Sequence, residues 1–270
     1  TTTNNVAIGY QSLGAATGSL LTGGSTVAIG YQAFGYIDGG AGNGVAIGYL
    51  AAANEPGGGI TAIGYRAAEN ASGSYQNNNI AIGSNAMNSY CGNNAQYSIA
   101  IGNSALKGNG NQGDGGSAAY NIAIGHTNLQ NISTGGGNVA IGGNSVYTAL
   151  TTGHSNIGIG RGTGQNATTT DHLILIGADS GNALTGTGPN GSIAIGHNAL
   201  ATHTTGARNI AIGWEAMHDT NVGSTALGSE DNIFMGYSAG GGIWADAASN
   251  KNIGIGNYTL DAAMNGALEN

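Results

Sequence analysis

The chain has 270 residues, of which 53 are glycine and only 7 % are charged, and its formal net charge is −8. Five basic residues, scattered along the whole length, form no patch that could neutralise phosphates, so nucleic acid is excluded as an expected partner. No run of 18 apolar residues is present, so we expect no membrane span, and the single cysteine, Cys91, cannot form a disulfide within the chain.

One motif, N-[VI]-A-I-G-x-x-A-L, recurs from end to end and sets the predicted elements. Its glycines are separated by 16 to 23 residues, and each follows a β-branched residue, a residue that is small in most copies, and an isoleucine or methionine. We therefore predict a short β-strand ending at each motif glycine. In chain order these are Gly9, Gly30, Gly48, Gly64, Gly83, Gly102, Gly125, Gly142, Gly160, Gly177, Gly196, Gly213, Gly236 and Gly256.

Side chains alternate between the two faces of a strand, so Val6 and Ile8 face one way while Ala7 faces the other. Such short strands cannot bury an apolar face alone, and stacking them in parallel solves the problem. The pattern predicts an all-β fold, a parallel β-solenoid of about fourteen coils, with the two aliphatic columns buried and a flat alanine and glycine face. Leu175 and Phe234 are large exceptions in the small column.

Residues 1–270 are expected to form a single repeat domain, with residues 257–270 as a C-terminal cap or linker. The apolar spacing of this tail suits a helical cap. Asparagine precedes the β-branched residue in eight copies, and we expect a hydrogen-bonded ladder of asparagines from coil to coil. The residue three positions after the glycine is Ser, Ala or Thr except at Asn128, which predicts a tight corner.

The residue directly after the motif glycine is aromatic in several copies. An aromatic ladder on an outer wall can stack on sugar rings, although stacking between coils or packing at a chain–chain interface would use the same residues. The candidate glycan-contacting residues are Tyr10, Tyr31, Tyr49, Tyr65, Trp214 and Tyr237.

Nothing in the sequence forms a catalytic, cofactor or metal motif, so we expect no enzyme activity, no cofactor and no metal site. The six histidines are scattered, and we read them as solvated. The glycine-rich run 108–116 with Asp114 is similar to calcium-binding nonapeptide repeats but occurs once. Glu230 and Asp231 could in principle cleave glycans as a carboxylate pair, but neighbouring residues usually point apart.

The repeat, in the form NVAIGYQSL at residues 5–13, resembles the YadA-like head repeats of trimeric autotransporter adhesins, which are also found in bacteriophage tail fibres. This resemblance covers nearly the whole chain and implies a left-handed parallel β-roll, with three chains packed around a common axis. A hexapeptide similar to that of left-handed β-helix acyltransferases appears once per coil. We interpret that likeness as shared coil geometry.

We therefore expect a structural and adhesive extracellular fibre segment, on a virion or cell surface, and most simply a phage tail fibre-like protein. Its partners would be its own copies, as a homotrimer packed through the alanine and glycine face, and a host-surface glycan or protein receptor. The alternatives are a bacterial surface adhesin, a subunit of a self-assembling end-to-end filament, and a glycan-degrading tailspike enzyme.

Overall fold

The computed structural model places the chain in two compact units, residues 1–137 and 138–270, and each unit is described by itself. Cys91 and Asp114 lie outside the described residues. The residues described are 4–14, 24–36, 43–54, 58–70, 78–89, 96–108, 118–143, 146–220, 228–244, 247–262 and 266–269.

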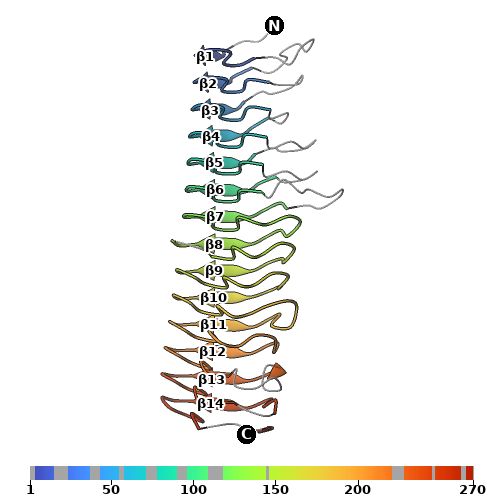
Figure 1. Cartoon of the computed structure of the whole chain (residues 1–270), viewed down its shortest axis with the longest axis vertical. Helices are drawn as coiled ribbons and strands as arrows, with labels where there is room; N and C mark the ends of the chain where they lie inside the picture. Colours follow the sequence, from blue (N-terminus) through green and yellow to red (C-terminus); the bar gives the residue numbers. More distant parts are fainter. Residues whose placement is uncertain are drawn as a thin grey trace. The chain divides into compact units, whose positions relative to one another are not determined.

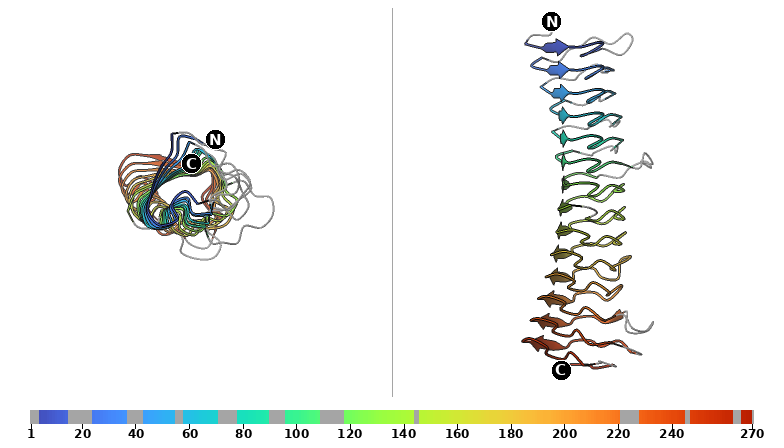
Figure 2. Two further views of the ribbon diagram at one scale, coloured as in Figure 1. Left: turned by 90° about the horizontal axis from the view of Figure 1, so that it is seen from above. Right: turned by 60° about the vertical axis from the view of Figure 1, so that its left-hand side comes forward.

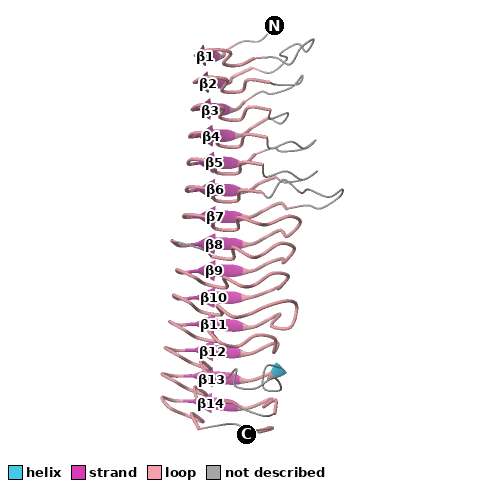
Figure 3. Ribbon diagram, viewed as in Figure 1, coloured by secondary structure: helices cyan, strands magenta, loops and turns pink. Residues whose placement is uncertain are grey.

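Unit 1 is a parallel β-solenoid with one three-residue strand in each repeat. Each strand pairs in parallel with the strand of the next repeat, in sequence order and with equivalent motif positions opposite one another. Figure 1 shows these strands one above the next, and Figure 3 shows the loops that connect them. The strands are β1 (Val6–Ile8), β2 (Val27–Ile29), β3 (Val45–Ile47), β4 (Thr61–Ile63), β5 (Ile80–Ile82), β6 (Ile99–Ile101) and β7 (Ile122–Ile124).

Unit 2 repeats this architecture with seven further strands. Their pairing is again parallel and in register, and Figure 2 shows them following one another in a single column. The predicted parallel solenoid with one strand per motif is therefore confirmed within each unit. The strands are β8 (Val139–Ile141), β9 (Ile157–Ile159), β10 (Ile174–Ile176), β11 (Ile193–Ile195), β12 (Ile210–Ile212), β13 (Ile233–Met235) and β14 (Ile253–Ile255).

The two faces of each strand are oriented the opposite way from the prediction. From β2 to β14 the middle residue of each strand is buried, and the residues on either side, nearly all aliphatic, are half-buried or exposed. Ile8 is 59 % exposed, whereas Ala28 is fully buried. The prediction that the aliphatic columns form the core is wrong, and the alanine face cannot serve as a contact between chains.

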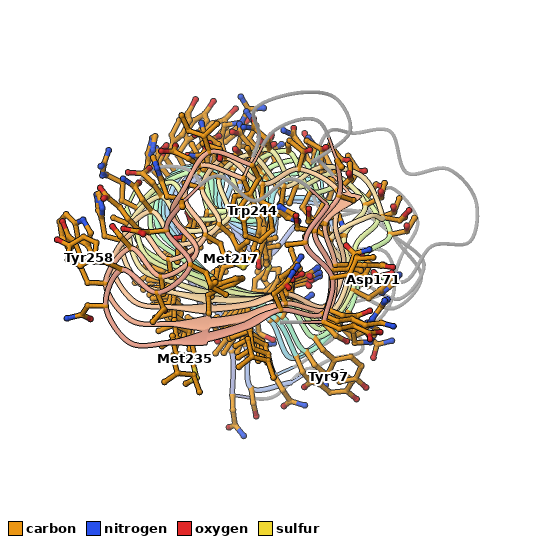
Figure 4. All side chains as sticks on the ribbon, turned by 90° about the horizontal axis from the view of Figure 1, so that it is seen from below. Tyr97, Asp171, Met217, Met235, Trp244 and Tyr258 are labelled. Carbon is orange, nitrogen blue, oxygen red and sulfur yellow. The ribbon has the colours of Figure 1, made fainter. Side chains whose placement is uncertain are left out.

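In many coils the core lies between the small strand residue and a larger side chain from the opposite wall. That side chain stands four positions after the motif glycine, as the buried Phe34, Leu106 and Leu200 do. Only a small residue in the strand leaves room for them. Figure 4 shows the resulting division in unit 2, where Met217 points into the coil and Met235 points out of it.

Leu175 and Phe234 fit this scheme because the opposite wall becomes small where the strand residue is large. Position four after the glycine is Gly181 in the coil of Leu175 and Gly240 in the coil of Phe234. A Cβ on Gly240 would lie 2.7 Å from Cδ1 of Phe234, and a Cβ on Gly181 would lie 2.8 Å from Cδ1 of Leu175. In these two coils the large residue stands in the strand and the glycine stands opposite it, which reverses the usual arrangement and keeps the interior filled.

The motif glycines are required by their backbone conformation and, in most coils, by the close approach of the next coil. These glycines have φ values such as 135° at Gly160 and 138° at Gly213, which residues with side chains rarely adopt. A Cβ on Gly213 would also lie 2.2 Å from the carbonyl oxygen of Gly236 in the next coil. The glycine therefore permits the turn out of the strand and the close stacking of coils.

The predicted asparagine ladder is present, with fully buried members. Oδ1 of Asn209 accepts a hydrogen bond from the backbone N–H of Asn232 (3.1 Å), and Oδ1 of Asn232 accepts one from the N–H of Asn252 (3.0 Å). The side-chain amide of Asn232 also donates to Oδ1 of Asn209 (3.1 Å) and to the carbonyl of Ser249 (2.8 Å). These bonds satisfy polar groups that would otherwise be buried without partners.

The described part of the C-terminal tail follows the path of a further repeat and is not helical. Leu268 forms a parallel bridge with Asn250, and the N–H of Glu269 donates to the carbonyl of Asn250 (3.1 Å). The N–H of Ala267 donates to Oγ of Ser249 (3.1 Å). The helical form of the expected cap is therefore absent from residues 257–262 and 266–269.

Candidate functional site

The candidate site is the column of residues that directly follow the motif glycines. The positive φ of each glycine turns the chain out of the strand, so the next residue lies at an outer corner of the coil. Because neighbouring strands are ~4.8 Å apart, side chains in equivalent corners can stack face to face. Aromatic residues at this position therefore meet across successive coils.

Unit 1 holds four tyrosines in this column, here called the tyrosine ladder: Tyr10, Tyr31, Tyr49 and Tyr65. Successive ring centroids are 5.3, 5.1 and 5.4 Å apart, and the planes differ by 15°, 12° and 9°. All four side chains are exposed. The structure brings these four candidates together, and the two inner rings are covered on both faces by their neighbours.

Unit 2 holds the remaining candidates, Trp214 and Tyr237, each with a partner that the sequence reasoning missed. The ring of Trp214 stacks on His197 with centroids 4.3 Å apart and planes 24° apart. The ring of Tyr237 meets Tyr258 edge to face, at 5.2 Å and 68°. His197 could have been found, because it also follows a motif glycine, in the repeat just before that of Trp214.

A second tyrosine stack in unit 1 stands at the other end of the strands. The rings of Tyr97 and Tyr120 lie 5.3 Å apart with planes 12° apart, and both are exposed. Each stands two residues before the β-branched residue of its repeat. That shared motif position is the signal in the sequence that marks this pair.

The carboxylate pair Glu230 and Asp231 converges on one cation. Asp231 accepts hydrogen bonds from Nε (2.6 Å) and Nη2 (3.0 Å) of Arg208, and Glu230 accepts one from Nη2 (3.1 Å). The expectation that the two side chains point apart is therefore wrong. The hydrogen bonds from Arg208 lower the pKa of Asp231, whereas a general acid for glycoside hydrolysis needs a raised pKa.

Among the described residues, no three His, Cys, Asp or Glu side chains are grouped in a way that could hold a metal ion. Within the same residues, no helix has the length and apolar character needed to cross a bilayer.

No family model matches the chain, and no curated protein or solved structure matches it either. What the aromatic columns do is therefore inferred from their own geometry and chemistry.

One histidine contradicts the reading of a solvated set. His203 is fully buried in unit 2, with Nδ1 3.0 Å from Oγ1 of Thr220 and Nε2 3.1 Å from the carbonyl of Gly206. A neutral ring fits this polar environment, since one of its nitrogens then donates a hydrogen bond and the other accepts one. Burial lowers the pKa of His203 from 6.5 to about 4 because the charged ring would lose its hydration.

This histidine predicts a loss of stability in mild acid. Between about pH 6.5 and pH 4 the unfolded chain binds a proton at His203 that the folded chain does not. The free energy of unfolding therefore falls as the pH is lowered through this range, by about 3 kcal/mol from this group. Urea unfolding midpoints measured from pH 7 to pH 4 should fall more steeply for the wild type than for His203→Gln. The exposed variant His172→Asn is the control and should keep the wild-type slope, and an unchanged slope in His203→Gln would contradict the prediction.

Proposed function

We propose that the chain is a structural and adhesive segment of an extracellular fibre, carried on a virion or a cell surface. One observation carries the proposal, namely that the outer face of the sheet in each unit is lined by uncharged aliphatic residues. These residues recur in every strand, and Ile8, Ile101, Ile159 and Ile255 are all exposed. Continuous exposed apolar surface of this kind usually marks a contact with another molecule.

The partner that fits this face best is a second and third copy of the same chain. The face is uncharged along the strands and repeats with the spacing of the coils, so an identical face can match it along its length. A homotrimer, expected earlier through the alanine face, is accordingly proposed through the aliphatic face. Trimerisation would present each attachment loop three times and would strengthen weak contacts by multivalency.

Attachment itself is proposed to use the exposed aromatic corners, with a host-surface glycan as the receptor class. Aromatic rings offer a large apolar area with a polar edge, which suits a sugar ring and its hydroxyls. A phage tail fibre-like role fits a repeated scaffold of this kind, and a bacterial surface adhesin or filament subunit would use the same surfaces.

Charged residues placed on the aliphatic face should prevent trimer formation. Replacing Ile159 and Ile195 by lysine should turn trimers into monomers while the fold remains intact, because both side chains stand on the outer face. Light scattering coupled to size exclusion should give three times the 26.4 kDa chain mass for the wild type and the single mass for the variant. Thr187→Lys, on an exposed loop, is the matched control and should stay trimeric. A wild type of 26.4 kDa in solution would remove the trimer.

A further inference from the structure

We propose that the corner formed by His197, Trp214, Glu215, Tyr237 and Tyr258, here called the Trp214 corner, is a binding platform for neutral sugars. This inference rests on the proposed attachment to glycans and assigns it to one place. It also separates this corner from the tyrosine ladder, to which a similar role was assigned from sequence.

The inner rings of the tyrosine ladder have both faces covered. In the tyrosine ladder, Tyr31 lies between Tyr10 and Tyr49, and Tyr49 lies between Tyr31 and Tyr65, with planes at most 15° apart. The inner rings therefore offer only their edges and hydroxyls to solvent. A sugar could stack on them only by separating the ladder, which would lose the ring contacts already made.

The Trp214 corner is arranged differently. His197 stacks on one face of the Trp214 ring, and Trp214 is still 51 % exposed. Tyr237 and Tyr258 meet edge to face, so their planes are not parallel and neither ring is enclosed in a continuous stack. Tyr258 is 59 % exposed and points away from the coil in Figure 4. The corner thus combines a large indole surface with two tyrosines at an angle to each other.

Polar groups accompany the rings of the Trp214 corner. The rings of Tyr237 and Tyr258 are in contact, and Tyr258 raises the pKa of Tyr237, with smaller contributions from burial and from the charge of Glu215. Glu215 directly follows Trp214, and its N–H is held by the carbonyl of His197 (2.9 Å). Hydrogen-bond acceptors and donors therefore border the aromatic surface, as the hydroxyls of a pyranose require.

The charge of the Trp214 corner favours a neutral ligand. The corner contains one carboxylate and no lysine or arginine among its five members. Glu215 would repel a uronic or sialic acid, whereas a neutral hexose can donate its hydroxyls to it. An apolar protein surface fits less well, because it would strip water from Glu215 without replacing its hydrogen bonds. A neutral sugar is therefore the occupant that suits both the rings and the charge.

The experiment measures binding of two neutral probes, cellohexaose and chitohexaose, and one acidic probe, hexagalacturonate, to the full chain. Calorimetry and the fluorescence of the exposed Trp214 report binding, since the other tryptophan, Trp244, is fully buried. We expect at least one neutral probe to bind and to change the fluorescence, with little binding of the acidic probe. Trp214→Ala should weaken neutral-probe binding about tenfold or more, and Trp214→Phe should weaken it less.

Two further variants make the outcomes distinct. Tyr49→Ala, in the tyrosine ladder, should leave binding of the neutral probe unchanged. Glu215→Gln should raise hexagalacturonate binding relative to the neutral probe, which a merely structural role of Glu215 would not do. If Tyr49→Ala abolishes binding and Trp214→Ala does not, the Trp214 corner is overturned while attachment to glycans stands. If no neutral probe binds the wild type, the platform is overturned, and adhesion of the same protein to host cells then decides the proposed function separately.

Discussion

Replacing Gly142 by alanine should disrupt the stacking of β8 on β9, whereas the same replacement one residue later, at Gly143, should be tolerated. A Cβ on Gly142 would lie 2.6 Å from the carbonyl oxygen of Gly160, and the φ of Gly142 is 153°. A Cβ on Gly143 would meet nothing within 4 Å. Backbone strain and overpacking together should cost at least about 4 kcal/mol at Gly142, and the cost at Gly143 should be within about 0.5 kcal/mol.

Two measurements check this pair of variants. Urea unfolding followed by circular dichroism compares the overall stability of each variant with the wild type. Hydrogen exchange locates the damage, because a solenoid opens locally and each coil depends on its neighbours. Gly142→Ala should lose protection first in β8 and β9. Equal effects of the two substitutions would mean that the contact between motif glycines does not limit the stacking.

The strands and their pairing could be predicted because the motif itself sets them. A β-branched residue and an isoleucine before a glycine recur at a spacing that only stacked parallel coils accommodate, and the asparagine ladder follows from the same register. The faces were predicted wrongly for a physical reason. A single strand shows that Val6 and Ile8 share a side, but it does not show which side is inside. That is decided by large residues elsewhere in the coil, such as Phe34 and Leu200, which take up the interior.

Those core residues were hidden because their backbone conformation is unusual. Leu106 and Leu200 have φ values of 48° and 53°, in the left-handed region that disfavours most side chains. Their N–H groups donate to the carbonyls of Asn128 and Ala216 in the next coil, at 3.0 Å each. Coil stacking therefore supports a conformation that local sequence would not suggest, and strand patterning alone could not reveal it.

The candidate site was predicted in part for a similar reason. The corner column was visible because Tyr10, Tyr31 and Trp214 all follow a motif glycine. Ring geometry was not visible, since it depends on the side chain in the next coil. Tyr258 stands one position further from its glycine than Tyr237 does, and this shift turns a stack into an edge-to-face contact.

The exchange of volume between Phe234 and Gly240 predicts strong coupling in a double-mutant cycle. Phe234→Ala alone removes a fully buried ring and should cost about 4 kcal/mol. Gly240→Leu alone should also destabilise the unit by about 3 kcal/mol, because the new side chain would meet the ring of Phe234. The double variant restores the arrangement of β11, where Ala194 in the strand faces Leu200 from the opposite wall.

The double variant should therefore be more stable than either single variant, with a coupling energy of about 3 kcal/mol or more from urea unfolding. The φ of Gly240 is 64°, close to the values that leucine already adopts at this motif position, so leucine adds little backbone strain there. A matched control is Gly240→Leu combined with Ile243→Ala, which changes an exposed side chain and should give no rescue. Simple additivity of Phe234→Ala and Gly240→Leu would show that the two positions do not share one space. In that case the glycine opposite would not be what makes room for a large strand residue such as Phe234.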